Sequence, residues 1–162
     1  MKLLPIPSEE SAEATLLPFL AQVVNWSIDA RPLGDEEILA DETLSGYIRG
    51  WGRSGDMGVF AVDDDGAPLG AAWVRMPAED WRGRGWAADT IPELLIAVAP
   101  DAQGEGVGTH LLRAVFDLLR LAGRGSVSLA VSEQNTAGEF FAANGFTIAG
   151  RNEDSDVLLR SL

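Results

Sequence analysis

The feature that most constrains this chain is a short apolar run followed by a glycine-rich loop and an amphipathic stretch, together residues 93–122. Residues 94–98 form an unbroken apolar run of the length expected for a buried strand, and Pro100 and Asp101 end it with residues that favour a turn. Apolar side chains then recur at three- and four-residue steps, which predicts a helix that ends near Gly123. They are Val107, Leu111, Val115, Leu118 and Ala122.

The loop between this strand and helix has the composition of an anion-binding site. Gly104, Gly106 and Gly108 alternate with other residues, so the backbone can take positive φ and an anion can approach the main-chain amides. The first amides of a helix have no intrahelical acceptors and carry the positive end of its dipole. We therefore expect a phosphate cradle, with glycines that only permit tight packing as the alternative.

Two common phosphate-binding patterns do not fit this loop. A P-loop requires a lysine directly after its second glycine, and no lysine stands there. The dinucleotide-binding fingerprint has glycines at its first, third and sixth positions, whereas these glycines fall at the first, third and fifth. A nucleotide-binding protein is therefore the weakest of the functions considered for this chain.

The same loop resembles motif A of the GNAT superfamily of acyl-CoA-dependent N-acyltransferases, Gln/Arg-x-x-Gly-x-Gly/Ala. Gln103, Gly106 and Gly108 match that motif position for position. A later stretch resembles the superfamily's motif B, and the resemblance is continuous from about residue 59 to the C-terminus. The residues that carry the second motif are Asn135, Thr136, Ala137, Phe140, Phe141, Gly145 and Phe146.

The resemblance implies an α/β fold in a single domain over residues 1–162, with a mixed, mostly antiparallel central sheet splayed at the cofactor-binding strand and helices on both faces. A chain of 162 residues is long enough for one such core. We expect strands at 2–6, 59–62, 68–76, 94–98, 127–131, 146–149 and 157–160. We expect helices at 8–26, 35–51, 107–122 and 135–143, the first two capped by Ser8 and Asp35, with Pro18 as a kink or as the true start of the first.

The function implied by the resemblance is an N-acetyltransferase that passes an acetyl group from acetyl-CoA to a primary amine by direct attack. The alternative is a non-catalytic acyl-CoA-binding sensor module. In either case the amides of the strand end and loop, with the asparagine and an aromatic residue of motif B, would hold acetyl-CoA. The implied cofactor-binding residues are Ala97, Val98, Gln103, Gly104, Glu105, Gly106, Val107, Gly108, Thr109, Asn135 and Phe141.

Glu93 is the candidate general base, because superfamily members often carry a glutamate just before this strand. Partial burial would raise its pKa towards neutral pH, which suits a base; the alternative is a solvent-facing glutamate at a strand end. The sequence does not identify the general acid. Relatives commonly have a tyrosine at the position of Phe141, and a phenylalanine cannot donate a proton. Tyr47, the only tyrosine, is expected mainly to pack, which leaves Ser132, water or no acid at all.

Several other residues have two interpretations each. Arg113, Arg120 and Arg124 would either meet the adenosine phosphates or lie on solvated helix faces. The irregular residues 77–91 contain Trp81, Arg82, Arg84 and Trp86, which would form either a lip over the acceptor site or an aromatic cover on a hydrophobic edge.

Composition excludes other classes of function. The chain has no cysteine and one histidine, so we expect no disulfide and no metal site. Its 12 basic against 25 acidic residues give a net charge of −13, which argues against a nucleic-acid partner. The first 80 residues are the more acidic half and would suit a cationic small-molecule or peptide amine. We expect a cytoplasmic protein that does not bind membranes. The sequence does not determine the oligomeric state, and a homodimer is one alternative because dimers are common among relatives.

Overall fold

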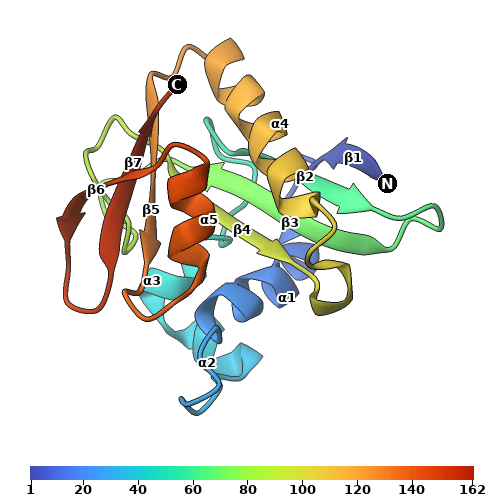
Figure 1. Cartoon of the computed structure of the whole chain (residues 1–162), viewed down its shortest axis with the longest axis horizontal. Coiled ribbons are helices and arrows are strands. Elements are labelled where there is room, and N and C mark those ends of the chain that lie inside the picture. The colour runs from blue at the N-terminus through green and yellow to red at the C-terminus, as the bar shows by residue number, and fades with distance from the viewer.

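The computed structural model describes all residues, 1–162, and contains one seven-stranded sheet with helices packed on both faces (Figure 1). The strands are β1 (Lys2–Pro5), β2 (Met57–Val62), β3 (Pro68–Arg75), β4 (Glu93–Val98), β5 (Ser126–Val131), β6 (Thr147–Arg151) and β7 (Asp156–Ser161). The helices are α1 (Ala12–Val24), α2 (Asp35–Ala40), α3 (Glu42–Ser45), α4 (Val107–Leu121) and α5 (Ala137–Ala143), with a 3₁₀ turn at Pro100–Ala102. No helix is long and apolar enough to span a membrane.

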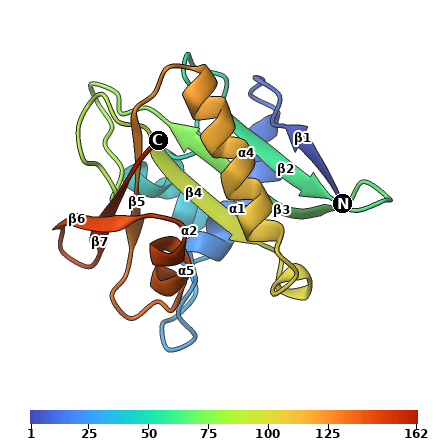
Figure 2. The same ribbon diagram turned by 45° about the horizontal axis from the view of Figure 1, so that its top comes forward.

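The sheet is antiparallel except at its centre, which confirms the expected mixed topology. Its order is β1-β2-β3-β4-β5-β7-β6, and only β4 and β5 run parallel. These two strands pair at a single position, Glu93 with Ser128, and their ribbons then diverge (Figure 2). By contrast β3 and β4 pair without interruption from Gly70–Val98 to Arg75–Glu93. The splay therefore comes from the divergence of β4 and β5, and β4 keeps a regular register with β3.

Two hydrophobic cores flank the sheet. The α4-side core has 18 buried residues, among them Leu94 of β4 and Leu111 of α4. The α1-side core has 16, among them Leu16 of α1 and Leu95 and Ala97 of β4. Successive side chains of a strand point to opposite faces, which explains why β4 serves both cores. The same alternation places the side chain of Glu93 on the α1 side.

The first helix differs from its predicted bounds. It was expected from Ser8, but α1 begins at Ala12, after a turn in which the Ser11 hydroxyl donates to Glu9 over 2.9 Å. Pro18 lies inside α1, so it is not the start of the helix. A single helix over 35–51 was also wrong.

The helix predicted over 35–51 is divided at Asp41. Asp41 takes an extended conformation and its carboxylate accepts hydrogen bonds from the amides of Thr43 and Leu44, each over 3.0 Å. It therefore caps α3 instead of continuing α2. The chain turns again after Ser45, which brings Tyr47 inward to the α1-side core.

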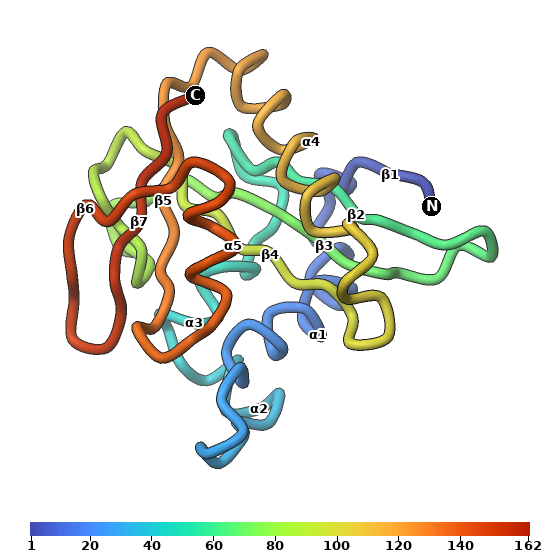
Figure 3. Tube along the Cα trace, in the orientation of Figure 1, coloured from blue at the N-terminus to red at the C-terminus, as the bar shows by residue number.

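Residues 77–91 form no helix or strand of their own, as predicted, and contain one isolated bridge, between Ala78 and Trp81. The chain trace carries this segment from the end of β3 to the side of β5 and β7 (Figure 3). The hydroxyl of Ser128 in β5 donates to the carbonyl of Gly85 over 2.6 Å, and the side chain of Asn152 donates to the carbonyl of Arg84. The segment is therefore fixed across the start of β4, directly over Glu93.

Candidate active site

The loop before α4 presents a row of backbone amides without partners. Gly104 has φ 81° and Gly106 has φ 84°, a left-handed conformation that favours glycine. The first backbone hydrogen bond after the loop is from His110 to Gly106, over 3.1 Å, and the amides of residues 104–109 donate to no protein group. They lie at the N-terminus of a 15-residue helix, where the dipole attracts negative charge. This is the arrangement that binds a phosphate or diphosphate.

The edge of β4 that faces β5 is open beyond Glu93. The amide of Ala99 donates to Leu69 over 2.7 Å, so odd-numbered residues of β4 direct their backbone towards β3 and even-numbered ones towards β5. The amides of Ile96 and Val98 therefore face the gap between the diverging strands, where no strand pairs with them. Ala97 is turned the other way, with its backbone towards β3 and its side chain in the α1-side core.

The carbonyl of Val98 connects β4 with α1 and with the loop before α4 through hydrogen bonds. It accepts a hydrogen bond from the Gln103 side chain over 3.1 Å and another from the side chain of Gln22 in α1. Gln103 is thus directed back to the strand and contributes to the loop by fixing its start. Glu105 is exposed, while Val107 is buried in the α4-side core with its side chain away from the loop surface.

The motif B residues occupy the other side of the gap. Asn135 uses its side-chain oxygen to accept from the amide of Ala137 over 3.0 Å, just before α5. Phe141 is 8% exposed and packs within the α4-side core, 5.7 Å from Phe146 between ring centroids. Phe140 instead lies beside Gly108 at the start of α4, as shown by the distance of 3.2 Å from its ring to a Cβ built on Gly108. The structure therefore places Phe140, a motif B residue that was not among the expected cofactor-binding residues, beside Gly108, while Phe141 is buried in the core.

Glu93 is buried, so its interpretation as a solvent-facing strand-end residue is wrong. The residue is 3% exposed, and its Oε2 accepts hydrogen bonds from the Tyr47 hydroxyl and, over 3.0 Å, from the amide of Gly85. Burial raises the pKa of Glu93 to about 7, although both hydrogen bonds and the charge of Arg84 favour the carboxylate. A carboxyl group with this pKa can exchange a proton near neutral pH.

Tyr47 packs against its neighbours, as expected, and also makes polar contacts that the sequence did not predict. Its ring meets Trp81 edge-on with centroids 5.1 Å apart, and its hydroxyl accepts from the amide of Arg84 over 2.8 Å while donating to Glu93. Burial, followed by the nearby charge of Glu93, raises the pKa of Tyr47 well above its usual value. The phenol therefore stays protonated and acts as a donor to Glu93.

The two tryptophans of the 77–91 segment have different surroundings. Trp81 packs on Tyr47 and donates from Nε1 to the Thr43 carbonyl over 3.1 Å, which matches the aromatic-cover interpretation. Trp86 lies at the surface beneath the guanidinium of Arg82, 4.5 Å from its ring centroid, and Arg82 also pairs with Asp89 over 3.1 Å. Only this second group is placed to form an exposed lip.

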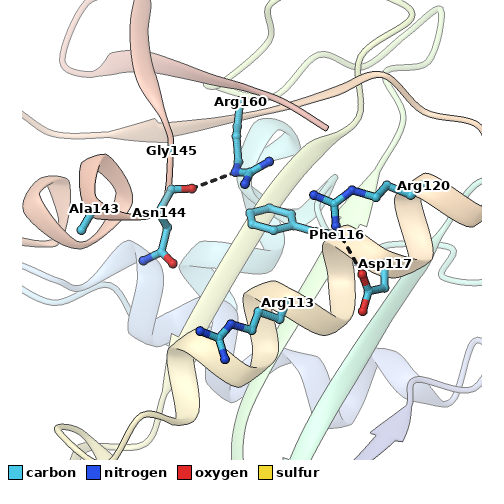
Figure 4. Close-up of a pocket in the computed structure, with 8 residues that line it drawn as sticks. All are labelled: Arg113, Phe116, Asp117, Arg120, Ala143, Asn144, Gly145 and Arg160. Carbon is cyan, nitrogen blue, oxygen red and sulfur yellow. Dashed lines mark hydrogen bonds and ion pairs between the residues drawn. The ribbon is translucent and has the colours of Figure 1, made fainter.

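A basic hollow of about 540 Å³ lies between the outer side of α4 and the end of α5 (Figure 4). Arg113 and Arg120 line it from α4, and Arg160 enters from β7 with its guanidinium 4.4 Å from the ring centroid of Phe116. Its one acidic residue, Asp117, pairs with Arg120 over 3.3 Å. Arg124 is not among the lining residues, and Arg160 was missed because strand residues far along the chain carry no local sign of such a contact.

The sequence model of the Acetyltransferase (GNAT) family matches residues 20–146. No curated protein matches the chain significantly in sequence.

Solved structures share the fold over almost the whole chain. A PaiA N-acetyltransferase from Thermoplasma acidophilum in complex with coenzyme A is 18% identical, with all of both chains covered and a TM-score of 0.64. A GCN5-related N-acetyltransferase from Kribbella flavida is 25% identical over 99% of this chain and 98% of the other, with a TM-score of 0.66. A phosphinothricin acetyltransferase from Sinorhizobium meliloti in complex with AcCoA is 20% identical over 100% and 89%, with a TM-score of 0.64.

Proposed function

The chain belongs to the Acetyltransferase (GNAT) family. We propose that it is an N-acetyltransferase that passes an acetyl group from acetyl-CoA to a primary amine by direct attack. The observation that carries the proposal is the presence of two sets of unpaired backbone amides, those of Ile96 and Val98 on the open edge of β4 and those of residues 104–109 before α4. Two of the structures with this fold contain coenzyme A or AcCoA, which supports the same ligand class here.

The two sets of unpaired amides would bind different parts of acetyl-CoA. The amides of 104–109 would hold the diphosphate, since a helix N-terminus with left-handed glycines stabilises negative charge. A Cβ on Gly104 would meet no atom within 4 Å, so the loop is open on its outer side. The amides of Ile96 and Val98, with Asn135 opposite, would pair with the pantetheine arm. Arg113 and Arg160 in the basic hollow would meet the adenosine phosphate.

Bound acetyl-CoA would supply a thioester carbonyl, and the reaction would exchange its C–S bond for a C–N bond as the thiolate leaves with the electron pair. The residues of this chain would prepare that exchange. Glu93 would take a proton from the acceptor ammonium, which leaves the nitrogen lone pair free for attack, and a pKa of about 7 suits that transfer. A backbone amide on the open edge of β4 would donate to the carbonyl oxygen as it gains negative charge.

The acceptor is proposed to be a cationic small molecule or peptide. The first 80 residues contain 15 acidic against 5 basic residues, and α1, α2 and α3 come from this half of the chain. Such a surface attracts cations and raises their local concentration near the site.

An assay of thiol release from acetyl-CoA over a broad panel of amines, with mass detection of the acetylated product, tests the proposal. Product formation that is lost in Glu93→Gln and Gly106→Val, but kept in a surface variant such as Leu121→Ala, supports it. Leu121 suits the control because its side chain is 87% exposed at the far end of α4.

The competing function is an acyl-CoA sensor without turnover. It is favoured by one observation, that Phe141 is packed in the core where relatives commonly have a tyrosine able to protonate the thiolate. Tight acetyl-CoA binding with no acetylation of any amine in the panel would favour the sensor over the transferase.

A further inference from the structure

The two oxygens of the Glu93 carboxylate have different surroundings. Both hydrogen bonds to the group, from the Tyr47 hydroxyl and the Gly85 amide, end on Oε2. Oε1 accepts no hydrogen bond. Because no buried side-chain nitrogen or oxygen in the structure lacks a partner, Oε1 is not fully enclosed, and it must account for part of the 3% of Glu93 that remains exposed.

The opening above Oε1 depends on Gly83. A Cβ at this position would overlap Oε1 of Glu93 and come within 2.5 Å of the Tyr47 hydroxyl. Gly83 is not among the glycines with positive φ, so the backbone conformation does not demand glycine there. Glycine is required at position 83 because any side chain there would collide with the Glu93 carboxylate.

The surroundings of Tyr47 leave its hydroxyl one direction in which to donate. The phenol has a single proton, and its oxygen already accepts from the Arg84 amide over 2.8 Å, so the proton points to Oε2 of Glu93. Its backbone is held by Trp73, whose Nε1 donates to the Tyr47 carbonyl over 3.1 Å, and its ring is held by Trp81. Three residues, one in β3 and two in the 77–91 segment, therefore fix this donor.

From these contacts we propose that Tyr47 is a positioning residue that occupies Oε2, so that Oε1 alone takes the proton of the acceptor amine, and that Gly83 keeps the approach to Oε1 open. The step is a simple transfer: an N–H bond of the ammonium breaks, an O–H bond forms at Oε1 directly or through one water, and the electron pair stays on nitrogen. This inference rests on the proposed function.

Few other charged groups face Glu93. Arg84 follows Gly83 and its charge favours the carboxylate. Arg75 is opposite Glu93 in β3, but its guanidinium is paired with Asp56 over 2.8 Å. From β5, the hydroxyl of Ser128 donates to the Gly85 carbonyl and makes no hydrogen bond to the Glu93 carboxylate. The neutral Tyr47 donor is therefore the main side-chain partner of the carboxylate.

The test compares the pH dependence of kcat/KM in wild type, Tyr47→Phe and Ser128→Ala, using an amine identified by the panel assay. Removing the Tyr47 donor destabilises the carboxylate, so the acid limb of the Tyr47→Phe profile should move to higher pH by about one pH unit, while acetyl-CoA affinity stays unchanged. Ser128→Ala removes a buried hydroxyl of β5 that donates to the Gly85 carbonyl and makes no hydrogen bond to the Glu93 carboxylate, so it should leave the limb in place.

An NMR titration of the Glu93 side-chain carboxyl carbon gives a second readout that needs no turnover. Tyr47→Phe should raise the titration midpoint. In the kinetic assay, Gly83→Ala in a folded protein should lower kcat/KM by at least about tenfold, because it hinders access to a base whose complete loss costs about 100-fold or more.

The outcomes separate this inference from the proposed function. If Glu93→Gln abolishes the acid limb while Tyr47→Phe leaves both the limb and the NMR midpoint at the wild-type pH, the inference is overturned and the transferase stands. If wild type acetylates no amine, the proposed function fails and the assignment of Oε1 fails with it.

Discussion

The hydroxyl of Tyr47 donates a hydrogen bond to the carboxylate of Glu93 in the interior of the protein, although the two residues are 46 positions apart. Tyr47 comes from the turn after α3, and Glu93 begins the strand that leads to the amide cradle. This contact connects the N-terminal helices to the strand proposed to hold acetyl-CoA. It also places the candidate base, Glu93, next to a neutral hydrogen-bond donor in a buried site. Burial raises the pKa of Glu93, and the hydrogen bond from Tyr47 partly offsets that rise.

The activity should depend on pH through Glu93. The pKa of Glu93 is about 7, and a base works only when deprotonated, so kcat/KM should rise as pH increases through about 7 and level off above it. Glu93→Gln should lower the rate by about 100-fold or more at pH 8 and remove this dependence, with acetyl-CoA affinity unchanged. A Glu93→Gln profile that coincides with that of wild type would remove Glu93 from the mechanism.

The stability of the protein should respond to the same group in the opposite sense. Folding raises the pKa of Glu93 from its ordinary 4.5 to about 7, so the buried carboxylate destabilises the folded state increasingly as pH rises from 4.5 to 7. Glu93→Gln carries no such charge and should be more stable than wild type at pH 8, by up to about 3 kcal/mol, and equally stable near pH 4. Denaturant unfolding at both pH values measures this; a constant difference would contradict it.

The glycine loop should be essential for cofactor binding. Gly106 has φ 84° at the N-cap of α4, and a valine there would strain the backbone and place bulk beside the amides. Gly106→Val should weaken acetyl-CoA binding by at least tenfold in calorimetry, which corresponds to about 1.4 kcal/mol. Gly66→Val is the matched control, because Gly66 has nearly the same φ of 83° in the β2–β3 hairpin and no neighbour within 4 Å of a Cβ. The control should lose stability but keep acetyl-CoA affinity.

The basic hollow should distinguish coenzyme A from its 3′-dephospho form. Arg113 lines the hollow and has no hydrogen bond or ion pair within the protein, so it is available to a phosphate. Wild type should bind coenzyme A about tenfold more tightly than the dephospho form, and Arg113→Ala should remove most of that ratio. Arg124→Ala, outside the hollow, should leave it intact. Equal binding of both forms by wild type would show that the hollow does not receive the phosphate.

The buried ion pair of Arg75 and Asp56 should contribute strongly to stability. Their side chains are 0% and 1% exposed, and Arg75 also donates to the Gly46 carbonyl over 2.8 Å, close to Tyr47. Asp56→Asn would leave the guanidinium without its counter-charge and should cost about 3–5 kcal/mol of unfolding free energy. Thermal and denaturant unfolding test this, with the exposed pair partner Asp89→Asn as a control expected to cost under about 1 kcal/mol.

Local signals explain why the centre of the fold could be predicted. Short-range patterns predicted a strand at 94–98 and a helix at 107–122, and the structure confirms both as β4 (Glu93–Val98) and α4 (Val107–Leu121). Of the three alternating glycines expected to allow positive φ, Gly104 and Gly106 take it. Helix boundaries were less predictable. The hydrophobic periodicity of 35–51 continues across Asp41, while the capping of α3 by its carboxylate depends on a backbone conformation that periodicity does not encode.

The composition of the site could be predicted less well, because its polar contacts join distant segments. Nothing near Tyr47 in the sequence indicates Glu93 or the amide of Arg84 as its partners. Phe140 and Phe141 are adjacent, and only packing decides that Phe141 is buried in the α4-side core while Phe140 is partly buried against it, since neighbouring helix residues point about 100° apart. Arg160 joins the basic hollow through pairing of β7 with β5 and β6.

The central claim is that backbone amides along β4 and before α4 hold the acyl donor, and a crystal structure of the protein with acetyl-CoA tests it most directly. We expect diphosphate oxygens within hydrogen-bonding distance of the amides of residues 104–109 and the pantetheine arm along the β4 edge at Ile96 and Val98. Acetyl-CoA bound elsewhere on the protein, with those amides facing only water, would contradict it.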